Sequence, residues 1–184
     1  MTNRTVLYGI GVSAGTASGP LAVVRPAVGV DDSEPAAVEG DSERVKAALQ
    51  EVAESLKQRA EHANSATSKQ VLEATATLAT DRGLIRGIEK ELKKGTGVTH
   101  AIHDAVEVYA GKLRKLGGYM AERVTDLYDI RDRATARVRG LPEPGVPDFA
   151  EPSILVAHDL AHRDPGRAAG HPGGRAGQGH PWGD

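Results

Sequence analysis

The chain has 184 residues, is 39% hydrophobic but only 3% aromatic, and carries a formal net charge of -2 at pH 7. This length suits one or two domains, whose core must rest on Ala, Val, Leu and Ile. A chain so close to neutral has no general attraction for nucleic acid or for an anionic membrane. The absence of cysteine excludes disulfides, thiolate chemistry and cysteine-ligated metals.

The sequence shows no targeting or membrane signal. It holds no window of about 18 apolar residues, and its N-terminus lacks a basic region followed by an apolar run. We therefore expect neither a membrane span nor a secretory signal. The cytoplasm is the default location of such a chain, and neither a membrane nor a nucleic acid is an expected partner.

The N-terminal segment, residues 5–30, combines β-branched residues with glycine and proline punctuation. This pattern predicts short strands joined by tight turns. Its glycines at positions 9, 11, 15 and 19 could suggest a phosphate-binding loop, but the stretch lacks Gly-Lys-Ser/Thr and the Gly-x-Gly-x-x-Gly spacing. Turns between strands are therefore the better explanation.

Residues 33–139 change to the apolar spacing of three and four residues that amphipathic helices show. Thr67-Ser68-Lys69-Gln70 fits a capping box ahead of the second stripe, Gly95 ends the third, and Gly117-Gly118 ends the fourth. We predict an antiparallel bundle of four helical units, one of them broken in two, because the connections are short. The predicted stripes are Val45, Leu49, Val52 and Leu56; Val71, Leu72 and Leu78; Leu84, Ile85, Ile88 and Leu92; Ile102, Val106, Tyr109, Leu113 and Leu116; and Val124, Leu127, Arg131, Ala134 and Val138.

The C-terminal part begins with a linker, because residues 140–152 hold four prolines. The run Ile154-Leu155-Val156-Ala157 is typical of a strand that a sheet buries on both faces, and we expect it to pair with the N-terminal strands. The helices then form an insertion between two parts of one α/β domain. Residues 161–184 contain no Leu, Ile, Val, Met or Phe, so we predict disorder there.

Two charged clusters require an interpretation. His100, His103 and Asp104 crowd one predicted helix end, but without a fourth ligand we interpret them as surface residues, not as metal ligands. The second cluster is acidic and lies in the last predicted helix. Because four arginines are nearby, we interpret it as a solvated charge lattice and not as a pair of catalytic carboxylates. These arginines are Arg123, Arg131, Arg133 and Arg137. The members of the acidic cluster are Glu122, Asp126 and Asp129.

Three motifs, in order along the chain, carry a family resemblance. They are Tyr8-Gly-Ile-Gly-Val-Ser-Ala-Gly-Thr-Ala-Ser-Gly-Pro20, then Tyr119-Met-Ala-Glu-Arg-Val-Thr-Asp-Leu-Tyr-Asp-Ile130 within the helical insertion, then Ile154-Leu-Val-Ala-His-Asp-Leu160. Over residues 5–160 the chain resembles Enzyme I, the phosphoenolpyruvate-protein phosphotransferase of the bacterial sugar phosphotransferase system.

The resemblance implies a fold and a separate role for each part of it. Residues 1–32 and 153–160 would be parts of a swivelling phosphohistidine α/β domain, 33–140 an inserted helical phosphocarrier-binding domain, 141–152 a linker and 161–184 a disordered tail. In the family, a histidine of the α/β part accepts a phosphoryl group from phosphoenolpyruvate, and the histidine-containing phosphocarrier protein receives it. Phosphoenolpyruvate, Mg2+ and dimerisation belong to a separate barrel, so we expect this chain to hold no cofactor and to be monomeric.

The chain departs from the family pattern at the catalytic step. The active histidine of the family lies in a Gly-Gly-x-Thr-Ser-His-x-x-Ile segment, but this chain contains no Thr-Ser-His. His180, which follows Gly173-Gly174-Arg175, is only a superficial echo of it. We therefore expect no catalytic residue and no barrel, and a truncation or frameshift after about residue 160 explains the tail better than a natural short protein does.

The resemblance also implies a docking face for the phosphocarrier on the helical part. The same leucines and Val106 could instead be bundle core, which their periodicity supports equally. Arg82-Gly83 stands where the family tends to place acidic residues, which implies a changed affinity or specificity. The residues of the expected docking face are Glu73, Leu78, Asp81, Leu84, His103, Val106, Tyr109, Leu113 and Arg123.

Two functions stay open at this point. The chain is part of a phosphotransferase that is inactive by itself, or it is a non-catalytic helical module that binds the phosphocarrier protein.

Overall fold

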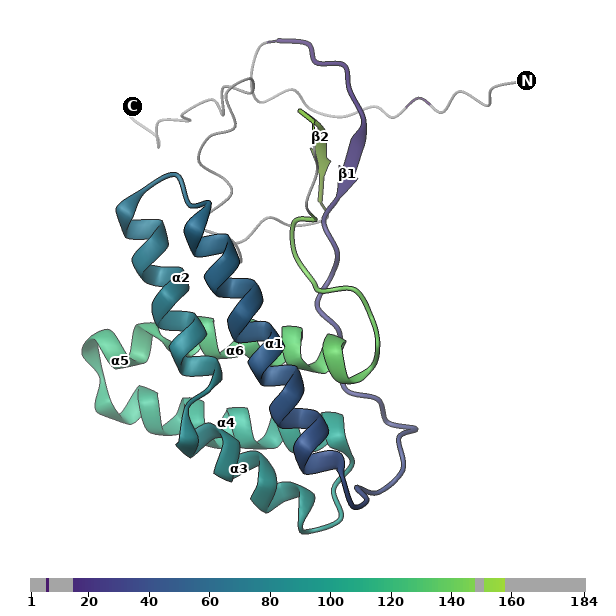
Figure 1. The fold of residues 1–184 in the computed structure, drawn as a ribbon, viewed down its shortest axis with the longest axis vertical. Helices are drawn as coiled ribbons and strands as arrows, with labels where there is room; N and C mark the ends of the chain where they lie inside the picture. Colours follow the sequence, from purple (N-terminus) through teal and green to yellow (C-terminus); the bar gives the residue numbers. More distant parts are fainter. Residues whose placement is uncertain (1–5, 7–14, 148–150, 158–184) are drawn as a thin grey trace, which may run out of the picture.

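The computed structural model describes residue 6 and residues 15–147 and 151–157, which form six helices and two strands. The helices make one body, and the two strands lie together beside it (Figure 1). The elements are β1 (Leu21–Val23), α1 (Asp41–Glu61), α2 (Ala66–Ala79), α3 (Arg82–Leu92), α4 (Val98–Leu116), α5 (Gly118–Glu122), α6 (Val124–Val138) and β2 (Ile154–Val156).

The helices pack around one apolar core. α1 and α2 form an antiparallel pair that packs against α6, α6 packs against α4, and α3 lies against α4 (Figure 1). The buried cluster consists almost entirely of Ala, Val, Leu and Ile, as the low aromatic content requires. None of the helices in the described ranges is long and apolar enough to cross a membrane.

The predicted first helix is confirmed, and the start of the second is corrected. All four stripe residues of α1 are buried. The helix-capping residue of α2 is Ser65, not Thr67, because the Ser65 hydroxyl accepts a hydrogen bond from the Ser68 amide at 3.1 Å. A serine before the first helical residue satisfies a backbone donor that would otherwise have no partner. The helix therefore starts earlier than the capping box indicated.

The predicted break within one helical unit is confirmed between α2 and α3. Asp81 has an extended backbone, and its side chain caps α3 by accepting from the amides of Gly83 and Leu84 at 2.7 and 3.1 Å. An Asp in this position ends the preceding helix and begins the next one. The short chain from Thr80 to Asp81 therefore lets α3 leave in a new direction.

The end of α4 differs from the prediction. Leu116 was expected in the apolar stripe, but it is 71% exposed, since α4 ends at this residue. The next two glycines take positive φ angles of 68° and 51°, which a residue with a side chain adopts rarely. The chain then forms α5, a five-residue helix that the sequence pattern did not predict.

The predicted α6 stripe is correct except at one position. Ile130 is fully buried, whereas Arg131 is half-buried and lies 4.8 Å from the centre of the Tyr128 ring. Residues three and four apart share a helix face, so Leu127, Ile130 and Ala134 form a continuous apolar stripe. The guanidinium of Arg131 lies outside the core, where it stacks on this ring and pairs with Asp132 at 2.8 Å.

The two strands form a parallel pair, which confirms that the returning strand joins the N-terminal one. Leu21 pairs with Ile154 and Val23 with Val156. The expectation that a sheet buries this strand on both faces is wrong for the part of the chain described, because Leu155 and Val156 are exposed. The expectations for residues 5, 7–14 and 158–184 lie outside the described residues.

Candidate docking site and linker contacts

The break between α2 and α3 is fixed by one residue of α4. Tyr109 donates its hydroxyl hydrogen bond to Asp81 Oδ1 at 2.8 Å. Burial and the Asp81 carboxylate together raise the pKa of Tyr109 to about 12, so the hydroxyl remains a neutral donor. Burial acts against ionisation of Asp81, but the Tyr109 hydroxyl and the Leu84 and Gly83 amides outweigh it and lower the pKa of Asp81.

Gly83 allows this close arrangement. A Cβ at this position would lie 2.9 Å from Asp81 Oδ1, which is closer than real Cβ contacts come, and 3.1 Å from Tyr109 Cε2, which is a tight contact. The absence of a side chain therefore lets the start of α3 approach the tyrosine ring. Gly83 therefore has a packing role, whatever effect the Arg82-Gly83 pair has on the surface charge.

Three residues of the expected docking face belong to the core. Leu84, Val106 and Leu113 are buried among the helices. Their side chains are therefore not available to a partner in this conformation. They lie where the alternative interpretation, bundle core, places them. Leu78 is half-buried and packs against the same core.

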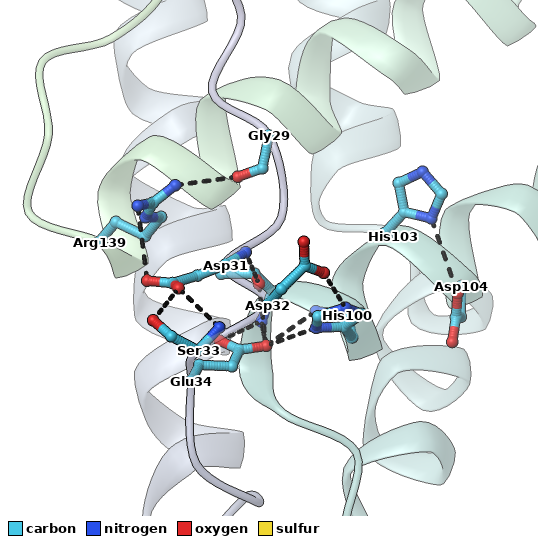
Figure 2. Close-up of polar contacts among 10 residues, drawn as sticks. Gly29, Asp31, Asp32, Ser33, Glu34, His100, His103, Asp104 and Arg139 are labelled. Carbon is cyan, nitrogen blue, oxygen red and sulfur yellow. Dashed lines mark hydrogen bonds and ion pairs between the residues drawn. The ribbon is translucent and has the colours of Figure 1, made fainter.

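The polar members of that face lie nearer to the surface. Glu73 is exposed and lies 3.9 Å from Lys69. His103 is half-buried and lies 3.6 Å from Asp104 (Figure 2). Arg123 contacts Asp126 at 2.9 Å.

A small exposed apolar patch lies at the junction of α4 and α5, close to Arg123, and the sequence pattern did not predict it. It consists of Leu116, Tyr119 and Met120, which are 71%, 64% and 47% exposed. Arg123 lies 5.8 Å from the centre of the Tyr119 ring, which connects the patch to the expected face. The available signal was the pair Tyr119-Met120 directly after two glycines. Clustered exposed apolar side chains are a frequent mark of a protein contact site.

A second group of polar residues binds the incoming and outgoing linkers to the base of the bundle. We call Asp31, Glu34, Thr99, His100 and Arg139 the linker clasp (Figure 2). Glu34 accepts from the Thr99 amide at 2.8 Å, from the Thr99 hydroxyl at 2.8 Å and from the His100 amide at 3.1 Å. Its carboxylate therefore caps the N-terminus of α4 in place of a local capping residue.

The rest of the clasp extends to α6. The Asp31 amide donates to the Thr99 hydroxyl at 2.9 Å, and the Asp31 carboxylate lies 3.5 Å from Arg139 at the end of α6. Arg139 also donates to the carbonyl of Gly29 at 3.1 Å. Segments from three parts of the sequence are therefore joined at one end of the bundle.

His100 has a different role from the one expected. It is not an ordinary surface residue, because its two ring nitrogens lie 3.1 Å from Glu34 and 3.3 Å from Asp32. The hydrogen bond to Glu34, with a smaller contribution from Asp32, raises the pKa of His100. Within the described residues, no group of three or more His, Cys, Asp or Glu side chains could hold a metal ion.

The interpretation of the arginines around α6 as a solvated lattice is wrong for Arg133. This residue is 1% exposed, and it forms ion pairs with Asp129 at 2.7 Å and with Glu143 at 2.9 Å. Glu143 also contacts Arg137 at 2.8 Å and accepts a hydrogen bond from Ser55 of α1 at 3.2 Å. The outgoing linker is therefore attached to α1 and α6 by a buried charge network.

The two linkers then meet each other before the sheet. Arg25 and Gly145 exchange two backbone hydrogen bonds of 3.0 and 2.9 Å. The short antiparallel bridge leads directly to β1 on one side and toward β2 on the other. The helical body is thus an insertion between two paired strands.

Comparison with known proteins agrees with this architecture. A solution NMR structure of an Enzyme I protein, nEIt, matches with a TM-score of 0.60 at 25% identity, over 80% of this chain and 62% of that chain. A phosphoenolpyruvate-protein phosphotransferase of Streptomyces coelicolor is 39% identical over 166 residues, 88% of this chain and 29% of that protein. One of Haloferax volcanii is 28% identical over 105 residues, 54% of this chain and 19% of that protein.

The chain thus spans less than a third of the length of these curated relatives. The expected fold, a helical bundle inserted into an α/β domain, is confirmed by the parallel strand pair and by the structural match. The model of the family described as PEP-utilising enzyme, N-terminal, matches residues 8–123. The chain therefore belongs to the family of PEP-utilising enzymes, of which it represents the N-terminal part.

Proposed function

We propose that the helical body docks the histidine-containing phosphocarrier protein, as the partner-binding part of a phosphoenolpyruvate-protein phosphotransferase. The docking surface is formed by the α2–α3 break, the adjoining part of α4, and α5. Membership of the family and the similarity to phosphoenolpyruvate-protein phosphotransferases support this proposal. Its exposed or half-buried members are Glu73, Leu78, Asp81, His103, Tyr109, Leu116, Tyr119, Met120 and Arg123.

The observation that carries the proposal is the exposed apolar patch of Leu116, Tyr119 and Met120. Burying a fully exposed Leu or Met side chain contributes about 1.5–3 kcal/mol, and the three side chains of the patch keep roughly half or more of their exposure. The patch lies next to Arg123, whose side chain is already held in place by its ion pair with Asp126. A partner can therefore bury the apolar centre without ordering a flexible rim.

The sequence supports docking without phosphoryl transfer for this polypeptide. Transfer between two proteins needs an imidazole that attacks the phosphorus and later releases it. The chain lacks the Thr-Ser-His segment in which the resemblance places that imidazole. We therefore infer a complex with the phosphocarrier in which no phosphohistidine forms on this chain.

A titration tests the docking surface. The isotope-labelled phosphocarrier is titrated with the full chain and its amide chemical shifts are followed by NMR. The double variant Tyr119→Ser, Met120→Ser is expected to weaken binding about tenfold or more, as loss of a central apolar contact does. Val38→Ser is the matched control, because Val38 is 69% exposed and lies three residues before α1, outside the proposed docking surface. The start of α1 is at the end of the bundle away from α5 (Figure 1).

The same mixture tests the absence of transfer. The phosphocarrier is labelled on its histidine with radioactive phosphate and is incubated with the full chain. Complex formation with no acid-labile label on this chain is the expected result. Label on this chain would overturn the inference that it is non-catalytic, while unchanged phosphocarrier shifts in the titration would overturn the docking proposal itself.

A further inference from the structure

The part of the incoming linker that crosses the base of the bundle is held by polar contacts more than by burial. We call this segment, residues 29–34, the strap (Figure 2). The structure describes all six of its residues, and none of them is fully buried. A segment with few buried apolar contacts opens locally at a low cost in free energy. The attachment of the strap therefore depends on its hydrogen bonds and charges.

The outgoing linker is attached by groups of a different kind. Glu143 pairs with the buried Arg133 at 2.9 Å, and Arg59 of α1 donates to the carbonyl of Val146 at 3.4 Å. An arginine keeps its charge throughout the physiological pH range. Burial acts against ionisation of Glu143, but Arg137 and Arg133 outweigh it and lower its pKa. The contacts of this linker are thus unchanged around neutral pH.

The strap, in contrast, depends on an imidazole. His100 Nδ1 lies 3.1 Å from Glu34 Oε1, and His100 Nε2 lies 3.3 Å from Asp32 Oδ1, so both ring nitrogens face carboxylates of the strap (Figure 2). The protonated ring can donate to both carboxylates at once, whereas the neutral ring has a single N–H. Loss of the proton therefore removes one hydrogen bond and the attraction of a cation to two anions.

The other charged groups around this imidazole keep their charge near neutral pH. Asp31 of the strap adds to the negative field at His100, and hydrogen bonds from Ser33 lower the pKa of Asp31. Arg139 of α6 pairs with Asp31 at 3.5 Å, on the side away from His100 (Figure 2). On α4 itself, Asp104 lies beside His103 at 3.6 Å. His100 is therefore the group in these strap contacts whose charge changes around neutral pH.

We propose that the strap is a pH-sensitive closure: it is bound to the base of the bundle while His100 is protonated and opens locally when His100 loses its proton, while the outgoing linker stays attached. The hydrogen bond to Glu34, with a smaller contribution from Asp32, raises the pKa of His100 above 6.5. Closure is therefore favoured below pH 6.5 and is lost as the pH rises through the pKa of the closed state. This inference is independent of the docking proposal.

Opening of the strap would uncover two features of the bundle. The first is the start of α4, where the amides of Thr99 and His100 donate to Glu34. The second is a cavity of about 400 Å3 between the strap and the bundle. The cavity lining includes Asp31 and Glu34 of the strap and Arg44, Val98 and Val138 of the bundle.

Amide proton exchange with water, followed by NMR on the full chain, tests this local opening. The Asp31 amide donates to the Thr99 hydroxyl at 2.9 Å, so its exchange reports opening of the strap. The parent chain is compared with His100→Gln at pH 6 and well above the midpoint of the His100 imidazole shift, since comparison at one pH cancels the chemical pH dependence of exchange. At pH 6 the Asp31 amide should exchange about two- to tenfold faster in the variant, as expected for lost exposed ion pairs. At the higher pH the two rates should converge.

Two further variants and one reference amide control the comparison. His103→Gln makes the same substitution on the same helix, beside Asp104 and away from the strap, and it should exchange like the parent chain at both pH values. Asp32→Asn removes one carboxylate and leaves the Glu34 cap in place, so it should give a smaller acceleration at pH 6. The Leu84 amide, bound by Asp81 at 3.1 Å, reports the bundle and should be unchanged in every variant.

The outcomes separate charge, side-chain shape and general unfolding. A ratio of variant to parent rates that is the same at both pH values would show that the shape of the imidazole matters and its charge does not. A ratio of one at pH 6 would show that His100 has no role in holding the strap. Equal acceleration of the Leu84 amide would show that the whole bundle opens. Each of these results would overturn the inference. Asp32 is exposed, so Asp32→Asn carries the same test if His100→Gln does not fold.

Discussion

The carboxylate of Glu34 accepts a hydrogen bond from the backbone amide of Thr99 at 2.8 Å, across a sequence separation of 65 residues. Because this bond joins the incoming linker to the first turn of α4, the linker cannot move away without exposing unsatisfied amides at the helix start. Arg139 holds the same linker to the end of α6. The attachment of the incoming linker, which connects the sheet to the helical body, therefore depends on a few polar contacts at one end of the bundle.

Replacing Glu34 by Ala should lower the free energy of unfolding by about 1–3 kcal/mol, because the Thr99 and His100 amides lose their cap. Burial acts against ionisation of Glu34, but the four hydrogen bonds from Thr99 and His100 outweigh it and lower its pKa below the ordinary 4.5. The stabilisation is thus present above pH 4.5 and is lost as the pH falls through the folded-state pKa. Urea unfolding measures the loss. The control is Glu39→Ala, at an exposed position on the same linker, which should change the free energy of unfolding very little.

Two glycines associated with α4 should respond to alanine in opposite directions. A Cβ at Gly97 would lie 2.4 Å from Glu34 Oε1 and 2.5 Å from Glu34 Cγ, so Gly97→Ala should displace the cap and destabilise the fold by about 1–3 kcal/mol. A Cβ at Gly111 meets no described atom within 4 Å, so Gly111→Ala should stabilise the helix by about 0.5–1 kcal/mol. Thermal unfolding of both variants checks this pair.

The mechanism of the Gly97 effect can be isolated by a double-mutant cycle. In a chain that already carries Glu34→Ala, the displaced side chain is gone, and Gly97→Ala should cost much less than in the parent chain. If the cost is unchanged, the backbone at Gly97 and not the Glu34 contact is responsible.

His100 should give the clasp a pH dependence of the opposite sign to that of Glu34. Its pKa is raised above the ordinary 6.5, first by the hydrogen bond to Glu34 and less by Asp32. The contribution of His100 is therefore fully present below pH 6.5 and is lost as the pH rises through the folded-state pKa. Urea midpoints on both sides of this range should fall with rising pH in the parent chain and change less in His100→Gln.

A direct titration tests whether the pH dependence belongs to His100. The imidazole proton shifts of His100, followed by NMR, should give a pKa above 6.5 in the parent chain and a lower one in Glu34→Gln. His62→Gln is the control for the unfolding series, because His62 is exposed at the end of α1 and its ring lies 2.8 Å from the Gln58 carbonyl, one turn back on its own helix. Loss of the pH dependence in the control would contradict the role given to His100.

The helix positions were predictable from the sequence because apolar periodicity is local. The stripes of α1, α3 and most of α4 and α6 correspond to buried faces, since a side chain every three or four residues returns to the same face. The sequence also predicted that one helical unit is broken in two, and the structure places that break at Asp81. The short α5 was missed, because five residues are too few to show a period.

The polar contacts were not predictable in the same way. Glu34 caps a helix that begins far along the sequence, and no local pattern marks a carboxylate cap supplied from such a distance. Arg133 resembles its exposed neighbours in the sequence, and only the folded linker brings Glu143 to it. Long-range charge pairs depend on tertiary structure, which explains why a lattice of exposed charges was expected there.

The hydrogen bond between Tyr109 and Asp81 should stabilise the α2–α3 break. Tyr109→Phe removes only the hydroxyl, and it should lower the free energy of unfolding by about 1.5–3 kcal/mol, the range for hydrogen bonds to charged groups. In a chain with Asp81→Asn the same substitution should cost less. The two effects, measured by urea unfolding, would be additive if the residues did not interact.

The buried network around Arg133 should make Glu143 one of the more sensitive positions on the outgoing linker. Glu143→Ala removes one of the carboxylates that pair with the buried Arg133 guanidinium, and we expect a loss of about 2–4 kcal/mol in the free energy of unfolding. Glu51→Ala is the matched control: Glu51 contacts the same Arg137, but at an exposed position, and its removal should cost less than about 1 kcal/mol.

The same carboxylate should also respond to pH and to replacement of its partner. Burial acts against ionisation of Glu143, but Arg137 and Arg133 outweigh it and lower its pKa, so its stabilisation is present above pH 4.5 and is lost as the pH falls. Arg133→Met combined with Glu143→Leu should be less destabilising than Glu143→Ala alone, because no buried charge is left without its partner. Equal losses in the double variant and in Glu143→Ala would show that packing, and not the uncompensated guanidinium, sets the cost.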